Sequence, residues 1–312
     1  MKTKIVYVLV SDNNDYYYEM FLMSFHSLQL YHPEAIVEVV MDEQTHQRLV
    51  MSKPSELDSV VCNVVSIPAY YMKMQKSRFL KTRLRHFVSG DFLYLDLDTL
   101  VCESLALIDE TYGSIGLILE NHGTNSHHED SYYPKEWKYL LNAKHFNGGV
   151  LYSKDNEESS RFFDQWHNNW KYCLESGCNF DQPGLRKAVL ESDVSIEELG
   201  GEWNCQISRI TSKEYQNTAK ILHYQRNAFF VSICKKIRRY GMNDSVIIKW
   251  LSSPRSYFIQ TNMFICQAEC EELEPIRFIQ YNYTGFYSFL VKISLFHRSI
   301  VSFLVRLRDR IK

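Results

Sequence analysis

The sequence predicts an α/β fold in which helices flank a Rossmann-like, mostly parallel central sheet, with a helical extension at the C-terminal end. Two apolar runs near the N-terminus are each followed by a helical pattern, and a third apolar run ends directly at two aspartates. The 312 residues are 45% hydrophobic and 23% charged, which is typical of a globular chain. We expect a main domain over residues 1–225 and the extension over residues 226–312.

The first half of the sheet is expected from strand and helix signals that alternate along the chain. Ile5–Val10 is a continuous run of β-branched and apolar residues, which is typical of a buried parallel strand. A helical pattern covers Tyr17–Tyr31 and ends before Pro33, because proline disfavours a helical conformation in the residue before it. Ile36–Met41 is then expected to form a second strand, and Gln44–Met51 a second helix.

The second half of the sheet is expected from the same alternation. Arg78–Val88 has the pattern of a basic amphipathic helix, and a Ser-Gly-Asp turn leads from it into a buried strand over Phe92–Leu95. Two more strands are expected at Ile115–Leu119 and Gly149–Tyr152, before a long helix over Glu157–Ser176 that is rich in Trp and Phe. This order predicts an open, mostly parallel sheet.

Residues 286–312 differ in composition from the rest of the chain. They carry six Lys or Arg and one acid, a net charge of +5, whereas the whole chain has a net charge of −2. Phe289, Ile293, Phe296 and Ile300 recur at helical spacing. A basic helix with an apolar stripe is typical of binding to an anionic membrane surface. A helix docked on the main domain is the alternative.

Cysteine use and hydropathy predict the compartment. The eight cysteines form no Cys-x-x-Cys pair, which favours reduced thiols in a reducing compartment. No stretch approaches the roughly 18 apolar residues of a membrane span, and the first apolar run meets an acid at Asp12 instead of continuing as a secretory signal. We therefore expect a cytoplasmic protein, peripheral on the inner face of the membrane. Nothing in the composition suggests nucleic acid as a partner.

Asp96 and Asp98 are the sharpest chemical feature of the sequence. They follow the apolar run Phe92–Leu95, and in open α/β sheets ligands bind beyond the carboxyl ends of the strands. Carboxylates suit hard cations such as Mn²⁺ or Mg²⁺. A cation held there could neutralise a diphosphate and stabilise it as a leaving group. The alternative is an acidic turn that only ends a strand.

Six motifs stand in an order that is similar to a known family. They are the first strand with Ser11-Asp12 and a tyrosine-bearing helix start, Ser77–Leu84 with Leu93–Asp98, His145–Val150, Asn179–Pro183, Glu202–Cys205 and Ile221–Tyr224. Together they cover residues 1–225. The order resembles that of the family-eight glycosyltransferases with an A-type nucleotide-sugar-binding fold, the group of glycogenin and the bacterial lipopolysaccharide galactosyltransferases.

The resemblance implies residues that bind the donor's nucleotide. Asp12 would hold the base by hydrogen bonds, Val10 would contribute its backbone, and Tyr17 would stack on the base, with Tyr16 a close alternative. Packing within the helix is the other interpretation of these tyrosines. Leu97, between the two aspartates, is also expected in the donor site.

The resemblance also implies residues that bind the phosphates and the sugar. Arg78 and Lys81 would contact the donor's phosphates or sugar; the alternative is a solvated basic helix face. Asn147, Gly148 and Gly149 would lie against the sugar, because glycine lets the backbone approach a ligand closely. The alternative for these three residues is a turn before a strand.

The reacting carbon and the third metal ligand are implied in the same way. The carbonyl of Gln182 would lie on the face opposite the leaving group, and Asp181 would orient the sugar, although Asp181 is also suited to cap a helix. His223 would be the third metal ligand; a packed histidine is the alternative. After it the family usually has a glycine and a lysine that grips the diphosphate, whereas this chain has Tyr224-Gln-Arg-Asn-Ala. Arg226, or Lys235 with Lys236, could replace that lysine.

These inferences predict a metal-dependent retaining glycosyltransferase that uses Mn²⁺ or Mg²⁺. The donor would be a nucleotide sugar, UDP-glucose or UDP-galactose, and the acceptor a surface glycan such as lipopolysaccharide or a lipid-linked saccharide. One alternative is a phosphohydrolase of the haloacid-dehalogenase type, but that family needs Thr or Val four residues after its first aspartate, where this chain has Leu100. A catalytically inactive, membrane-associated binding protein is the other alternative.

Overall fold

The structure, a computed structural model, describes residues 1–52, 55–120, 133–206, 218–224, 228–243, 247–248 and 251. Its centre is a seven-stranded sheet. In spatial order the strands are β3 (Val61–Val65), β2 (Val37–Asp42), β1 (Lys4–Leu9), β4 (Phe92–Leu95), β7 (Phe146–Ser153), β6 (Ile115–Leu119) and β8 (Ile196–Leu199). Within this sheet only β7 is antiparallel to its neighbours. The predicted α/β fold with a mostly parallel sheet is therefore confirmed.

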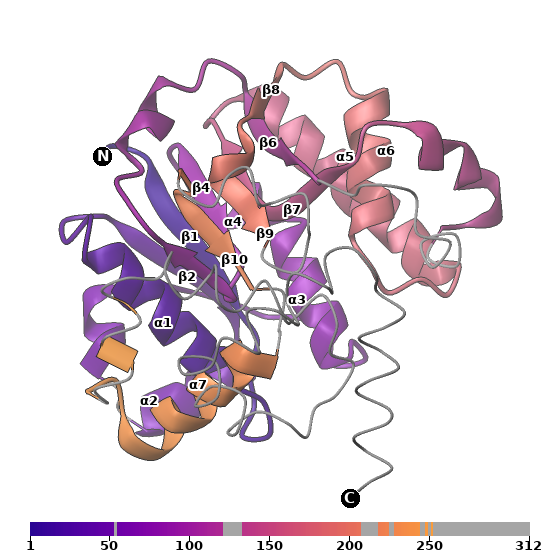
Figure 1. The fold of residues 1–312 in the computed structure, drawn as a ribbon. Coiled ribbons are helices and arrows are strands. Elements are labelled where there is room, and N and C mark those ends of the chain that lie inside the picture. The colour runs from indigo at the N-terminus through magenta and orange to yellow at the C-terminus, as the bar shows by residue number, and fades with distance from the viewer. Residues whose placement is uncertain are drawn as a thin grey trace, which may run out of the picture.

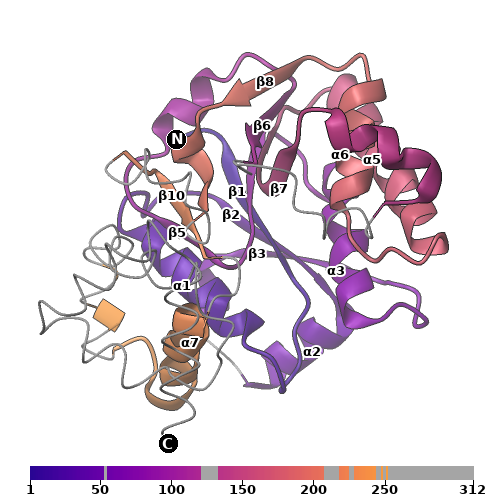
Figure 2. The ribbon, with the colours of Figure 1, turned by 45° about the vertical axis from the view of Figure 1, so that its right-hand side comes forward.

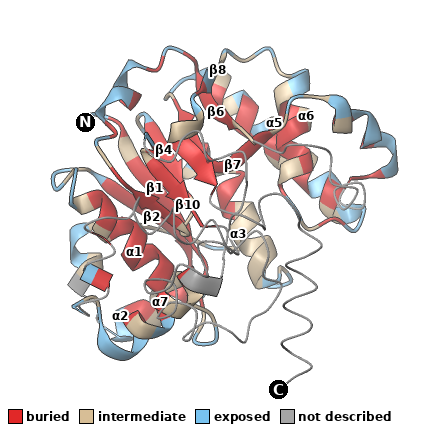
Figure 3. Cartoon of the chain, viewed as in Figure 1, coloured by how far each residue is buried: buried red, intermediate tan, exposed pale blue. Residues whose placement is uncertain are grey.

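Helices cover both faces of the sheet because alternate residues of its strands point to opposite sides. In β1, Ile5 and Tyr7 pack with α1 (Tyr17–Gln29), α2 (Glu43–Ser52) and α7 (Ala228–Tyr240). Val6 and Val8 pack instead with α3 (Lys73–Lys81), α5 (Glu157–Glu175) and α6 (Gln182–Glu191). The two helical layers are seen in Figures 1 and 2, and Figure 3 shows the buried strands between them.

A second, three-stranded sheet lies on the α1 side. It consists of β5 (Thr99–Val101), β10 (Ile221–His223) and β9 (Cys205–Gln206), with β10 in the middle. Four short 3-10 helices, η1 (Ser55–Ser59), η2 (Ala106–Glu110), η4 (Lys135–Asn142) and η5 (Gly201–Asn204), connect other elements in the described part of the chain. The chain passes from β4 of the large sheet to β5 of the small sheet through Asp96-Leu97-Asp98, so the junction of the two sheets lies at the aspartates.

One predicted helix is wrong in its bounds. Instead of one helix over Arg78–Val88, the structure has α3, which begins at Lys73, and the short α4 (Leu84–Phe87). The break follows Thr82, whose hydroxyl donates a hydrogen bond to the carbonyl oxygen of Arg78 at 2.8 Å. A threonine side chain that bonds back to the preceding turn competes with the helical pattern.

None of the three strands of the small sheet was predicted from the sequence, nor were two strands of the large sheet, β3 and β8. β3 is half exposed along most of its length, and β8 has the sequence Ile-Glu-Glu-Leu. Both lie at an edge of the large sheet, where one side of the strand pairs with no other strand of the described part of the chain. Strands of this kind lack the apolar run that signals a central strand.

The predicted C-terminal extension is described only in part. α7 belongs to it and packs on α1, with Ile233 and Ile237 buried in the same core cluster. Arg238 of α7 forms an ion pair with Glu19 of α1 at 2.6 Å. The predicted basic helix at 286–312 lies outside the described residues. Within the described part, no helix is both long and apolar enough to cross a membrane.

Candidate active site

The two aspartates reach one site because the chain turns between them. The N–H of Asp96 donates to the carbonyl oxygen of Gly149 at 2.7 Å, which continues the large sheet by one residue beyond β4. The chain then turns, and the carbonyl oxygen of Asp98 accepts from the N–H of Tyr224 at 2.8 Å on the small sheet. The antiparallel register sets His223 opposite Thr99. Two sheets thus deliver the three side chains.

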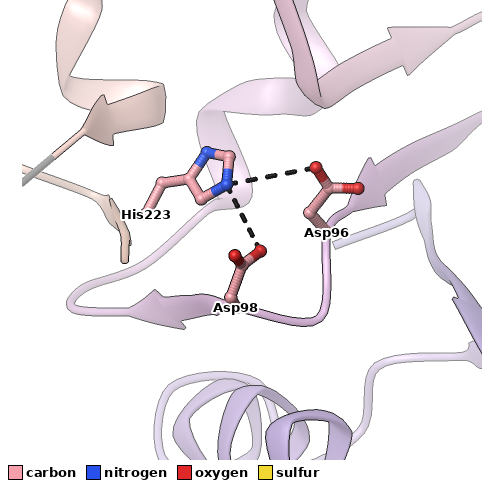
Figure 4. A group of neighbouring side chains, drawn as sticks. All are labelled: Asp96, Asp98 and His223. Carbon is pink, nitrogen blue, oxygen red and sulfur yellow. Dashed lines mark ion pairs between the residues drawn. The ribbon is translucent and has the colours of Figure 1, made fainter. Parts of the chain in front are cut away.

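Asp96, Asp98 and His223 form a compact group of potential ligands. One ligand atom from each lies within 4.8 Å of the others. Nε2 of His223 is 3.3 Å from Oδ1 of Asp98 and 4.0 Å from Oδ2 of Asp96 (Figure 4). Burial lowers the pKa of His223, but Asp98 and Asp96 outweigh it, so the net shift is upward. The two carboxylates would therefore favour a cation at this place.

The group fits a divalent cation in its chemistry and its space. Two carboxylate oxygens and one imidazole nitrogen are ligands that Mn²⁺ accepts. A Cβ at Gly149 would lie 2.8 Å from Oδ2 of Asp96 and closer still to the ring of His223, so only glycine leaves this space open. Burial raises the pKa of Asp96, but Lys81, His223 and the Tyr94 hydroxyl hold it below its usual value, so this carboxylate stays charged.

The group opens into a cavity of about 500 Å³. The predicted site residues that line it are Val10, Tyr17, Arg78, Lys81, Asp96, Leu97, Asp98, Asn147, Gly148, Gly149, Asp181, Gln182 and His223. Asp12 is not among the lining residues. The structure therefore brings residues from distant parts of the sequence to one place, while their individual roles remain predictions.

Asp181 does not act as a capping side chain. It precedes α6, but its carboxylate makes no capping hydrogen bond. Oδ1 is instead 2.8 Å from Nε of Arg78, and Oδ2 is 3.6 Å from Nζ of Lys81. The carbonyl oxygen of Asp181 accepts from Nε1 of Trp166 at 3.0 Å, which ties the start of α6 to α5. The carboxylate is thus turned away from the helix and into the cavity wall.

Arg78 and Lys81 do not form a solvated basic face. The side chain of Lys81 is 5% exposed and lies 3.1 Å from Oδ1 of Asp96. Burial lowers the pKa of Arg78, but Asp181 and Asp96 outweigh it and raise the pKa overall. The two cations therefore sit between the predicted metal ligand and the predicted sugar-binding carboxylate.

The amide of Gln182 is held in one orientation. Its Oε1 accepts from the N–H of Gly148 at 3.2 Å, and its Nε2 donates to the carbonyl oxygen of Phe146 at 2.8 Å. Nε2 is also 3.4 Å from Oε2 of Glu120, which pairs with Nε2 of His145 at 3.1 Å. Glu120 was missed in the sequence, although it follows the strand β6 directly, as Asp96 follows β4.

The predicted base-binding end contains a lysine that the sequence did not reveal. Nζ of Lys73 is 2.7 Å from Oδ2 of Asp12 and 2.8 Å from Oδ2 of Asp15. The hydrogen bond from Lys73 lowers the pKa of Asp12. Lys73 lines the cavity together with Tyr17. Tyr16 instead has its ring 4.3 Å from the guanidinium of Arg238 on α7.

The residues proposed to replace the family's lysine are not among the described residues that line the cavity. Arg226 lies outside the described residues. Lys235 and Lys236 are on α7, and neither lines the described cavity.

No protein-family model and no curated protein sequence matches this chain. Solved structures do resemble it. The apo crystal structure of mouse xyloside xylosyltransferase 1 aligns with 72% of this chain and 98% of its own, at 14% identity and a TM-score of 0.50. The glycosyltransferase GlyE of Streptococcus pneumoniae TIGR4 aligns with 81% of this chain and 65% of its own, at 17% identity and a TM-score of 0.51.

The chain has the A-type glycosyltransferase fold. At these identities the likeness is one of fold. The A-type fold predicted from the order of the motifs is thereby confirmed.

Proposed function

We propose that this chain is a metal-dependent, retaining glycosyltransferase similar to family eight, which transfers a hexose from a nucleotide sugar to a glycan. The observation that carries the proposal is the group of Asp96, Asp98 and His223, which opens into the same cavity as Asp181 and Gln182 on an A-type glycosyltransferase fold. UDP-glucose or UDP-galactose is the proposed donor, and a lipopolysaccharide or lipid-linked saccharide the proposed acceptor.

The metal ligands would be Asp96, Asp98 and His223, with Mn²⁺ or Mg²⁺ as the cation. When bound, the cation would neutralise the donor's diphosphate and stabilise it as a leaving group. Arg78 and Lys81 border the same space and would add positive charge on the side of the sugar. Val10, Asp12 and Tyr17 would bind the nucleotide, and Leu97 would contribute to the same wall.

The sugar would lie between the metal ligands and α6. Oδ2 of Asp181 is buried and has no hydrogen-bond partner among the described residues, so a sugar hydroxyl could satisfy it. Asn147, Gly148 and Gly149, which also line the cavity, would lie against the sugar. Gln182 lines the cavity, and its carbonyl oxygen would lie on the face of the reacting carbon opposite the leaving group.

A panel of nucleotide sugars tests the proposal directly. We expect slow hydrolysis of one UDP-hexose that needs Mn²⁺ or Mg²⁺, and Asp98→Asn should remove nearly all of it with an unchanged circular dichroism spectrum. Full activity in excess EDTA would exclude the metal role. Proton NMR of a transferred sugar should show an α-linked product from an α-linked donor, and a β-linked product would exclude retention.

A further inference from the structure

We infer that Asn204 is a positioning residue that sets the tautomer of His223 and thereby prepares it as a metal ligand. The inference rests on the proposed metal site. Asn204 is the last residue of η5, directly before β9, and it is 4% exposed. It does not line the cavity, so any effect on the site must act through its neighbours.

The side-chain amide of Asn204 joins two residues of the site. Its Nδ2 is 2.9 Å from Oδ1 of Asn147, and its Oδ1 is 2.9 Å from Nδ1 of His223. An amide can be turned by 180° without changing its shape, so its orientation must be decided from the partners. The partners here leave one orientation.

The orientation follows from a backbone donor. The N–H of Gly149 donates to Oδ1 of Asn147 at 2.8 Å, and a backbone N–H can only donate, so this atom of Asn147 is the oxygen. Asn204 must therefore present its NH₂ group to Asn147. Its oxygen then faces Nδ1 of His223, and an amide oxygen can only accept, so a neutral ring that keeps this hydrogen bond carries its proton on Nδ1.

The tautomer decides what His223 offers to the site. With its proton on Nδ1, the neutral ring has a free electron pair on Nε2, the atom that faces Asp98 at 3.3 Å and Asp96 at 4.0 Å. A cation needs that pair. A histidine that binds a metal usually donates its other ring N–H to a fixed acceptor, and loss of the acceptor costs about 10- to 100-fold in metal affinity. Asn204 is that acceptor.

The first measurement needs no metal and no variant of Asn204. The protein is labelled with ¹⁵N-histidine, and its nitrogen shifts are recorded without metal in alkaline buffer; His223→Gln identifies the signals of His223. We expect the proton on Nδ1 and an unprotonated Nε2. A proton on Nε2 in the wild type would overturn the inference.

The second measurement compares the Mn²⁺ dissociation constants of three variants by electron paramagnetic resonance. Asn204→Ala should bind Mn²⁺ about 10- to 100-fold more weakly. Asn204→Asp keeps an acceptor for Nδ1 but cannot donate to Asn147, so it should keep the tautomer and bind Mn²⁺ no more weakly than the wild type. Asn63→Ala, which removes a hydrogen bond from the edge strand β3 to Glu38 of its neighbour β2, is the matched control.

The outcomes separate this inference from the proposed function. If the wild type binds no Mn²⁺, the proposed metal site is wrong, and the tautomer in the wild type still decides the role of Asn204. If Asn204→Ala binds Mn²⁺ like the wild type, the inference is wrong. It is also wrong if Asn204→Asp loses as much affinity as Asn204→Ala, because the link to Asn147 would then be the one that matters.

Discussion

Substitution of Gly149 by alanine would place a methyl group inside the candidate metal centre. The added carbon would lie 2.8 Å from Oδ2 of Asp96, 2.8 Å from Oδ1 of Asn147 and closer still to Cε1 of His223. These atoms belong to three segments that the two sheets fix in place, so at least one must move. Overpacking of this kind costs about 1–3 kcal/mol, and two of the three neighbours are proposed ligands.

The expected result is a folded variant that has lost its metal site. Loss of a group that hydrogen-bonds to a metal ligand weakens metal binding by about 10- to 100-fold. Displacement of a ligand itself should therefore weaken Mn²⁺ binding by at least about 100-fold. Mn²⁺ titration monitored by electron paramagnetic resonance measures this, and a thermal melt reports whether the variant folds. Binding as tight as in the wild type would refute the assignment of Asp96 and His223 as ligands.

Gly148→Ala is the matched control on the adjacent residue. Its Cβ would lie 3.0 Å from Oε1 of Gln182 and 3.3 Å from Cδ2 of Leu185, and no proposed metal ligand is among its nearest neighbours. This variant should keep its Mn²⁺ affinity while donor hydrolysis falls, because the added methyl group presses on the side-chain amide of Gln182, which we propose to lie at the reacting carbon. Equal loss of Mn²⁺ binding in both variants would point to a general disturbance of β7.

Three further perturbations test other parts of the molecule. Because the pKa of His223 is raised in the folded protein, its protonation stabilises the metal-free protein fully below the ordinary histidine pKa, and this stability is lost as the pH rises through the raised value. The melting temperatures of the wild type and His223→Gln, measured in EDTA, should therefore converge as the pH rises. A difference that stays constant with pH would contradict this. Arg238→Ala removes a half-exposed ion pair with Glu19 that is worth at most about 1 kcal/mol, so the melting temperature should fall only slightly. The KM for the donor should rise, because Arg238 also binds the backbone of the 13–15 loop. An unchanged KM would show that α7 does not influence donor binding. Removal of residues 286–312 should move the protein from the membrane fraction to the soluble fraction, and donor hydrolysis should be retained. A full-length chain that does not bind anionic vesicles at low salt would contradict the membrane role of these residues.

The sequence predicted the strand that carries the aspartates but not how they meet the histidine. Phe92–Leu95 is a strand at the predicted residues, because four apolar residues between a turn and two acids leave few alternatives. The meeting of Asp98 with His223 depends on the pairing of β5 with β10, across more than a hundred residues of sequence. No local pattern encodes such a pairing, so only the family order of motifs suggested it.

Charge patterns in the sequence were misleading where burial decides the outcome. Arg78 and Lys81 stand in a basic stretch that has the pattern of a solvated helix face, yet α3 turns both toward carboxylates. Asp181 precedes a proline at the start of a helix, a good capping position, yet its carboxylate pairs with Arg78. In each case an ion pair with a residue distant in sequence replaces the interaction that the local sequence favours, because burying a charge without an oppositely charged partner costs free energy.

The candidate metal centre joins two sheets, neither of which could build it alone. Asp96 extends the large sheet, whereas Asp98 and His223 belong to the small one, and the two carboxylates repel each other across the junction. A divalent cation would replace that repulsion with attraction, so its binding would also hold the sheets together. Binding to the folded state alone stabilises it by about 2.7 kcal/mol at a cation concentration of about 100 times Kd. Mn²⁺ should therefore raise the melting temperature of the wild type but not of Asp98→Asn, and an equal rise in both would mean that the cation binds elsewhere.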